Sequence, residues 1–511
     1  MLGKVGLGGL FQQKSGHPLA DPRECRRIIG ELPKDNAFKA LDEIVAWLES
    51  LIAAPDFPED QLYEVLIQLE ECALFHLGRL SREYLQNARQ SRAEERRLWA
   101  INTSFWRLLS DAYEHCLDVF RPGLRQPEAL RQALPALCAR QIAALATLLK
   151  WELFHYAPTL ETVWGRVGHA ILVAESEGVD GKAVTLGGAG RVTSPAQEFR
   201  KLVIFQSASP DSLRPVDMEL AERLIAHYLP GFVCTAMASH DSVYWIDLAQ
   251  SLPPQRLARM PTKAEKTQRF FRPAAAHAEL KSLLLKLERG DPLPADINLG
   301  AQYASKAILP ALRHLVTYLA PIPPQREHDR HRVTHRMSVL HGLVNAFVVF
   351  SGEFGGRPAG LQIEDWAVEN VSRGGFGALV PNVGSDWLKV GALIAMQPDG
   401  GSNWLLGIVR RCLRENGQQT RVGIQTLARK VVSVDLRGAE AGVMAGVPGL
   451  MLGDGNAAGE TRLILPAGSF SPLEVLECRL EGQRCLLKPV AIVEQTADYE
   501  LARYRLETPL H

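Results

Sequence analysis

Apolar residues in the first 320 positions recur at helical spacing, and short breaks that contain proline separate the runs. Positions three and four apart share one face of an α-helix, so each run predicts a helix with one buried face. Asp35 and Asn36 precede the first clear run and are residue types that cap a helix start well. The runs cover residues 38–52, 62–73, 105–120, 129–153, 218–229, 279–287 and 306–319. Their close succession favours a helical bundle or stacked helical hairpins.

The second part of this helical region is less uniform. Residues 242–248 combine β-branched and aromatic side chains and predict a strand. The glycine-rich segment 186–191 matches neither a P-loop nor a dinucleotide-binding fingerprint, so no phosphate loop is predicted there. We therefore expect a helical bundle over residues 1–160 and a mixed, mainly helical domain over residues 161–320.

The hydrophobic period changes from 3.6 to 2 after the proline-rich segment 321–324, which ends the last helix because proline has no N–H to donate. Short alternating runs separated by turn residues are typical of a small antiparallel barrel or sandwich. The expected strands include residues 344–350, 388–396, 404–409 and 421–427, followed by a loose joint at 446–455. The chain is thus predicted to be an α+β protein, with a barrel over residues 325–440. Further strands over residues 441–511 either extend that barrel or form a second small one.

Charge and composition narrow the class of protein. The 511 residues contain 57 Lys+Arg and 57 Asp+Glu, so no net charge draws the whole chain to nucleic acid or to an anionic membrane. No apolar run reaches the roughly 18–20 residues that span a bilayer, and the first residues do not resemble a signal peptide. Eight scattered cysteines without a CxxC pair indicate reduced, mainly structural thiols, and a cytoplasmic protein is expected.

Catalytic motifs are missing from the sequence. There is no HExxH segment, and no serine stands in the GxSxG context of a hydrolase nucleophile. We predict no enzymatic activity, although a site within residues 150–320 stays open as a weaker alternative.

A cluster of arginines and histidines lies between residues 326 and 341, at the start of the predicted barrel region. The histidine spacing matches no usual zinc pattern and no cysteine accompanies it, so no metal site is predicted. Arginine offers a planar fork that binds phosphate in two bonds, and it also binds the O6/N7 edge of guanine. The arginines therefore indicate a ligand that carries phosphates and guanines.

A second polar group follows at residues 370–375. In an extended segment Asn370 and Ser372 point to the same side, so an amide and a hydroxyl are presented together. Gly374 and Gly375 then leave the backbone open to a ligand or a tight turn. The alternative is a turn in which the Asn and Ser side chains bond their own backbone.

These two segments resemble the motifs of PilZ domains, small bacterial β-barrels that bind the second messenger cyclic di-GMP. Residues 332–336 fit the RxxxR motif and residues 370–375 fit the [D/N]xSxxG motif, while residues 404–410 and 422–425 look like later strands of that family. The resemblance covers roughly residues 325–440. It implies that Arg332 and Arg336 bind the phosphates and the guanine edge.

The resemblance also implies that Asn370 and Ser372 bond guanine polar atoms and that Gly375 permits close approach. Arg326 and Arg330 fit RxxxR as well. We prefer the 332/336 register because a strand-like run, residues 337–343, follows at once, with Arg330 as an auxiliary ligand-binding residue.

The function that follows is a cyclic di-GMP receptor that passes the signal to a protein partner through the helical region. No cofactor besides that ligand, no nucleic-acid polymer and no membrane span is expected. A degenerate PilZ barrel that acts as a protein-interaction scaffold without binding the nucleotide is the alternative. The downstream process, a homo-oligomer, and one or two ligand molecules per site are left open.

Overall fold

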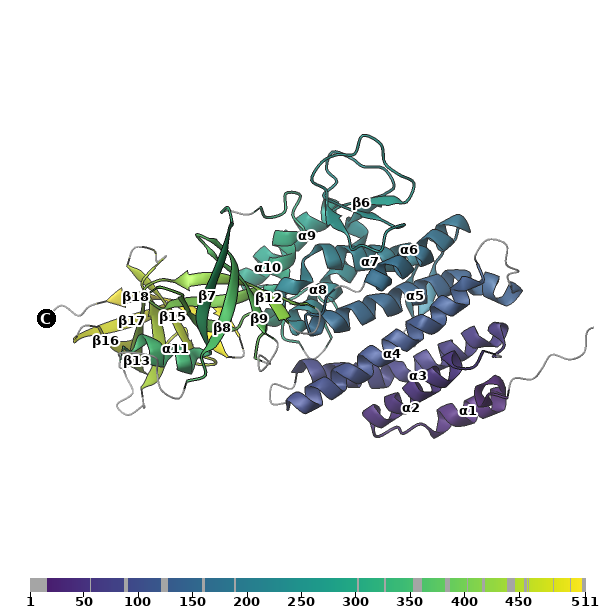
Figure 1. The fold of residues 1–511 in the computed structure, drawn as a ribbon, viewed down its shortest axis with the longest axis horizontal. Coiled ribbons are helices and arrows are strands. Elements are labelled where there is room, and N and C mark those ends of the chain that lie inside the picture. Colours follow the sequence, from purple (N-terminus) through teal and green to yellow (C-terminus); the bar gives the residue numbers. More distant parts are fainter. Residues whose placement is uncertain are drawn as a thin grey trace, which may run out of the picture. The chain divides into compact units, whose positions relative to one another are not determined.

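The computed structural model divides the chain into two compact units. It describes residues 16–511 except 56, 87–90, 121–126, 159–160, 188–189, 301–302, 326–327, 353–360, 382–386, 402, 416–418, 439–445, 455–456, 458, 481, 497 and 508–511. The helical unit contains residues up to Pro324, and the β unit contains residues from Gln325 onward. Two short segments, His155–Pro158 and Asp211–Arg214, belong to the β unit. Figure 1 draws the helical unit in purple to teal and the β unit in green to yellow.

Long antiparallel helices build the first half of the helical unit. They are α1 (Pro22–Glu31), α2 (Ala37–Ile52), α3 (Glu59–Gln86), α4 (Arg92–Asp118), α5 (Glu128–Phe154) and α6 (Glu161–Ser176). Asn36 caps α2 as the sequence predicts, since its side chain accepts a hydrogen bond from the Lys39 N–H. Ser91 and Glu94 form a reciprocal capping box at the start of α4.

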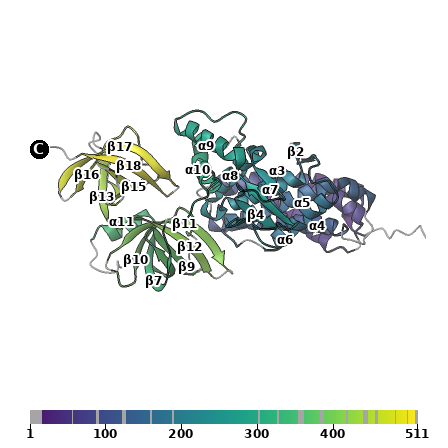
Figure 2. The ribbon, with the colours of Figure 1, turned by 90° about the horizontal axis from the view of Figure 1, so that it is seen from above.

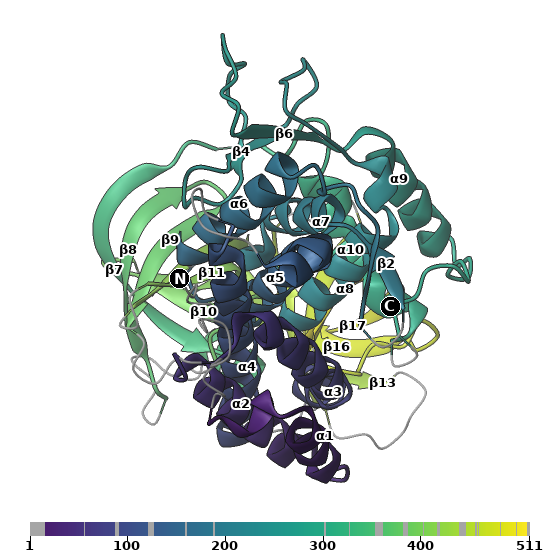
Figure 3. The ribbon, with the colours of Figure 1, turned by 90° about the vertical axis from the view of Figure 1, so that its right-hand side faces the viewer.

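Helix α5 is the central helix of this unit. It packs against α3, α4 and α6, and also against α7 (Pro195–Ser207) and α8 (Pro215–His227) (Figure 3). By length and composition it is the one helix among the described residues that is long and apolar enough to cross a membrane. However, 72% of its most apolar window is buried inside the unit. Packing on several sides therefore accounts for its apolar composition.

Small sheets and two later helices complete the helical unit. The strands β1 (Val184–Leu186) and β2 (Arg191–Thr193) form a hairpin. The sheet with order β3-β6-β4-β5 and the helices that follow it have these bounds: β3 (Val233–Thr235), β4 (Tyr244–Asp247), β5 (Gln255–Arg256), β6 (Gln268–Arg272), α9 (Ala274–Glu288) and α10 (Leu309–Tyr318). Strand β4 lies where the sequence predicts it.

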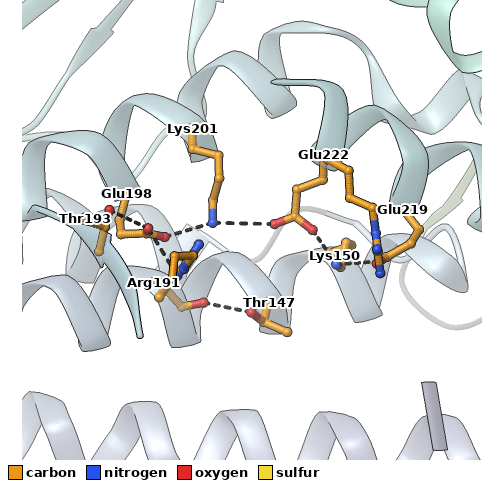
Figure 4. A network of polar contacts seen from close by, with 10 residues as sticks. Thr147, Lys150, Arg191, Thr193, Glu198, Lys201, Glu219 and Glu222 are labelled. Carbon is orange, nitrogen blue, oxygen red and sulfur yellow. Dashed lines mark hydrogen bonds and ion pairs between the residues drawn. The ribbon is translucent and has the colours of Figure 1, made fainter. Parts of the chain in front are cut away.

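A buried network of ion pairs joins α5, α7, α8 and β2 (Figure 4). Lys150 bonds Glu219 at 2.7 Å and also bonds Glu222. Lys201 lies 2.8 Å from Glu198 and 3.8 Å from Glu222. Arg191 and Thr193 bond Glu198 from the β hairpin, and Arg223 bonds Glu219 at 2.8 Å. Each buried carboxylate thus has a cation, which a charge needs when it is removed from water.

This network predicts acid sensitivity of the helical unit. Burial opposes ionisation of Glu222, but the charges of Lys150 and Lys201 outweigh it and lower its pKa to about 2. A carboxyl group of the unfolded chain titrates near about 4.3, so the folded protein binds fewer protons between roughly pH 4.5 and pH 2. The stability that this carboxylate contributes is present above that window and is lost as the pH falls through it.

We expect the melting temperature, followed by circular dichroism at 222 nm, to fall on acidification below about pH 4.5. The variant Glu222→Gln cannot ionise, so it should show a shallower fall than the wild type. An equal slope in the two proteins would contradict the assignment.

The first part of the β unit is a closed six-stranded antiparallel barrel. Its strands, in the order β10-β11-β12-β9-β8-β7, are β7 (His331–His341), β8 (Glu364–Ser372), β9 (Gly375–Pro381), β10 (Leu393–Pro398), β11 (Leu405–Glu415) and β12 (Gln419–Ala428). Closure leaves no strand edge unpaired.

The second part is another closed six-stranded barrel. Its strands, in the order β13-β14-β15-β18-β17-β16, are β13 (Val431–Gly438), β14 (Val447–Leu452), β15 (Glu460–Pro466), β16 (Leu476–Leu480), β17 (Gln483–Gln495) and β18 (Tyr499–Glu507). Numbered from the first strand of each barrel, both have the pairing 1-2, 2-3, 3-6, 6-5, 5-4 and 4-1. The second barrel therefore repeats the topology of the first. The second barrel begins at Val431, so strand β13 is part of the second barrel and not of the first.

Helix α11 (Leu343–Phe350) contacts strands of both barrels (Figure 2). One hydrophobic core includes Leu343 and Ala346 of this helix, Ile408 of the first barrel and Leu450 of the second. A forked ion pair between Arg410 on β11 and Glu494 on β17, with N–O distances of 2.9 and 2.8 Å, adds a polar link. The two barrels thus share a core instead of being joined by a chain segment alone.

The α+β prediction is confirmed, whereas two local predictions are wrong. Residues 344–350 form part of α11 and not a strand, because a short, mainly apolar run fits a helix as well as a strand. The predicted loose joint at 446–455 contains β14. Gly449 lies inside that strand because a Cβ there would come within 2.5 Å of Leu436 Cδ1. All eight cysteines are free in the structure.

Candidate functional site

Strands β7 and β8 bring the two predicted motifs together. Arg332 on β7 pairs directly with Asn370 on β8. Cβ atoms of directly opposed residues lie about 4.5–5.5 Å apart, so these two residues are cross-strand neighbours. Between Arg332 and His335 strand β7 carries one residue more than β8, which is a β-bulge. Bulges re-aim side chains and are frequent beside functional sites.

The guanidinium groups of Arg332 and Arg336 are available to a ligand. Both residues are exposed, and Arg336 pairs with Ala367, which lies three residues along β8 from Asn370, the partner of Arg332. Within the described part of the chain, no hydrogen bond or ion pair engages either guanidinium. We call Arg332, Arg336, Asn370 and Ser372 the arginine corner.

Asn370 is half-buried and its amide is incompletely bonded. Its Oδ1 is a buried oxygen that accepts no hydrogen bond among the described residues. The side chain lies over Gly377 of β9, where an added Cβ would come within 2.6 Å of Asn370 Nδ2. Gly377 therefore makes room for this amide. A buried oxygen without a hydrogen-bond partner costs free energy, so a ligand group that donates to Asn370 Oδ1 would remove that cost.

Ser372 and Gly375 have local contacts in the β8–β9 turn. The Ser372 hydroxyl donates to the Gly375 carbonyl at 3.3 Å, which is long for an O–H···O bond. An added Cβ at Gly375 would lie 1.9 Å from the Ile424 carbonyl oxygen of β12, so glycine is required there by strand packing. The alternative in which the Ser372 side chain bonds the backbone of its own turn is therefore partly met, through the contact with Gly375.

The segment before β7 borders the same turn. An added Cβ at Gly374 would lie 3.6 Å from His328 Cδ2, so His328 lies beside the turn. Arg330 is exposed next to it and takes part in an interaction within the protein. Arg326, the first residue of the alternative register, lies outside the described residues.

The second barrel lacks these side chains at the equivalent place. There the pair Val432–Met451 stands where Arg332–Asn370 stands in the first barrel. Ser372 stands two residues after Asn370, and the residue two positions after Met451, just beyond β14, is Gly453. The polar chemistry of the arginine corner is therefore confined to one of the two barrels.

The helical unit contains a different candidate, a cavity of about 930 Å³ between α2, α4, α5 and α6. Its charged lining is already paired: Arg107 with Glu152 and Arg166 with Asp111, each at 2.8 Å. Glu114 bonds His169 at 2.7 Å. Burial raises the pKa of Glu114, but its bonds to His169 and Gln141 outweigh burial and lower it.

Glu114, Asp118 and His169 have oxygen and nitrogen atoms close enough to hold a cation. However, Arg166 Nε lies 3.6 Å from Glu114 Oε2 and supplies positive charge at that point. Ion pairs therefore already engage two of these three residues, Glu114 and His169.

The first barrel thus presents two exposed arginines on β7, one of them opposite Asn370. Residues 23–237 match the family model described as the N-terminal domain of the cyclic-di-GMP receptor FimW. This match lies in the helical part and covers less than half of the 511 residues. The family is described as a receptor. No curated protein matches the chain.

The role of Ser372 gives a direct test. Because its bond to Gly375 is long, the variant Ser372→Ala should leave the melting temperature of the unliganded protein nearly unchanged. It should weaken ligand binding about 2- to 12-fold if the hydroxyl bonds the ligand. Melting curves with and without cyclic di-GMP measure both quantities, because ligand stabilisation depends on the dissociation constant.

Ser338→Ala is the matched control. Ser338 lies on β7 and donates to Asp365 at 3.3 Å, which is the same length as the Ser372 bond, but it lies outside the arginine corner. A purely local role of Ser372 predicts a lowered melting temperature and unchanged affinity.

Proposed function

We propose that this protein is a cyclic di-GMP receptor and that the arginine corner of its first barrel binds the nucleotide, as in PilZ domains. The observation that carries the proposal is the cross-strand pair Arg332–Asn370, with the exposed Arg336 four residues further along β7. Two exposed guanidinium groups match the two phosphates of the ligand, and an amide with an unbonded oxygen suits the polar edge of guanine.

The family match of residues 23–237 supports the same ligand from an independent part of the chain. The resemblance to PilZ motifs rests on residues 332–336 and 370–375, whereas the family model covers helices. Both lead to cyclic di-GMP. We further propose that the helical unit carries the signal to a protein partner, while the barrel holds the nucleotide, and that the protein works in the cytoplasm.

Calorimetry of the full chain with cyclic di-GMP tests the proposal. We expect saturable binding, with a stoichiometry that shows whether one or two molecules bind. Cyclic di-AMP is the control, because adenine presents an N6 donor where guanine presents the O6 acceptor that arginine binds. Equal affinity for both nucleotides would contradict a contact between an arginine and the O6 atom of guanine. Absence of binding would favour the alternative, a PilZ-like barrel that acts as a protein-interaction scaffold.

A further inference from the structure

The segment between the two barrels brings an additional arginine to the turn of the arginine corner. Arg429 follows the last strand of the first barrel, and its Nη2 donates to the carbonyl oxygen of Arg373 at 3.3 Å. Arg373 lies directly after Ser372 in the β8–β9 turn. The guanidinium of Arg429 is therefore held at the turn that carries the second motif.

The backbone places Arg429 at the same end of the barrel as the motif. The Thr426 N–H donates to the Gly374 carbonyl at 3.0 Å, so the end of β12 lies against the β8–β9 turn. The start of β7 reaches the same end, because His331 pairs with Val371. Cationic side chains thus approach this turn from the start of β7, from the turn itself and from the end of β12.

The second barrel fixes the backbone of Arg429. Asp454, just after β14, accepts hydrogen bonds from the N–H groups of Arg429 and Lys430, at 2.6 and 3.2 Å. Arg462 in turn donates to the carbonyls of Leu427 and Asp454. The backbone on which Arg429 is carried is therefore bonded to residues of the second barrel.

We propose that Arg429 is a further ligand-binding residue of the arginine corner and that Asp454 is the residue that positions it. This inference rests on the proposed function, because it concerns the same nucleotide. The second barrel then has a defined role: among its described residues the position equivalent to Arg332–Asn370 is occupied by Val432–Met451, and this barrel holds an arginine for the site of its neighbour. Ligand binding is in this way coupled to both barrels.

Calorimetry with cyclic di-GMP on the full chain tests the role of Arg429. We expect Arg429→Ala to weaken binding about tenfold, since a bond to a charged group is lost. The control Arg479→Ala removes an exposed arginine of β16 and should bind as the wild type does. Arg429→Lys keeps the charge without the fork, so its affinity should be intermediate.

The possible failures are distinguishable. If the wild type binds, Arg332→Ala loses binding and Arg429→Ala binds normally, the proposed function holds and this inference is wrong. If the wild type does not bind, both are wrong. A role of Arg429 in fastening the turn alone would lower the melting temperature without ligand while leaving the affinity unchanged.

A double-mutant cycle tests the positioning role of Asp454. Asp454→Ala should weaken binding several-fold in the wild type but have no further effect in the Arg429→Ala background. An equal loss of affinity in both backgrounds would show that Asp454 acts on general stability and not through Arg429.

Discussion

Alanine in place of Arg332 or Arg336 is expected to weaken binding of cyclic di-GMP at least about tenfold, the largest effect on affinity of any change considered. A hydrogen bond to a charged group contributes about 1.5–3 kcal/mol, and each 1.4 kcal/mol changes an affinity about tenfold. Neither guanidinium bonds another described residue, so its removal should leave folding stability nearly unchanged. Calorimetry gives the affinity, and thermal melting without ligand gives the stability.

Arg437→Ala provides the matched control, because Arg437 is an exposed arginine on β13, the equivalent of β7 in the second barrel. Lysine at position 332 or 336 should restore binding poorly, since it keeps the charge and loses the fork. If both alanine variants titrate like the wild type, the 332/336 register is wrong. Arg326 and Arg330 are then the residues to replace.

Replacing Lys150 by methionine is expected to lower the stability of the helical unit by about 3–5 kcal/mol. Lys150 is 9% exposed and bonds both Glu219 and Glu222, so its loss leaves buried carboxylates without their main cation. Arg223 and Lys201 still bond these carboxylates and moderate the loss. Urea unfolding followed at 222 nm measures the change, because that signal comes mainly from helices.

Two further variants separate charge from packing. Adding Glu222→Gln to Lys150→Met removes a carboxylate that has lost its nearer cation, so the double variant should be more stable than the sum of the single effects predicts. Lys281→Met replaces an exposed lysine of α9 and should be nearly neutral. Additive losses would mean that the ion pairs do not couple Lys150 to Glu222.

Local patterns were sufficient to predict the class of fold. The period change after Pro324 marks the start of the β unit, and Asn36 caps a helix where its side-chain chemistry indicates. The same reasoning fails for residues 344–350, because six of these seven residues are apolar and the run shows no clear period of 2 or 3.6. The helix forms there since both barrels present apolar surface to it, and such long-range contacts are not visible in a local window.

The arginine corner was predicted in part. The resemblance to PilZ motifs implies Arg332, Arg336, Asn370 and Ser372 as ligand-binding residues. Strand pairing brings Arg332 opposite Asn370. Arg429 stands 54 residues or more from each motif residue in the turn, and no pattern marks it. Lys150 likewise stands inside the apolar run at residues 129–153, where no local pattern indicates an ion-pair network. Its partners lie about 70 residues away in the sequence, so the pairing depends on how α5 and α8 pack.

The repeated strand order of the two barrels has a consequence for how the chain folds. Neighbouring domains of like topology can exchange equivalent strands during folding, which gives misassembled species. Here the equivalent first strands differ in chemistry: β7 begins with exposed arginines and histidines, whereas β13 carries Val432 at the position of Arg332. A swapped strand would place Arg332 opposite Met451 and Val432 opposite Asn370, so a polar residue would face an apolar one in both barrels. Sequence divergence between the barrels thus protects each of them against pairing with strands of the other.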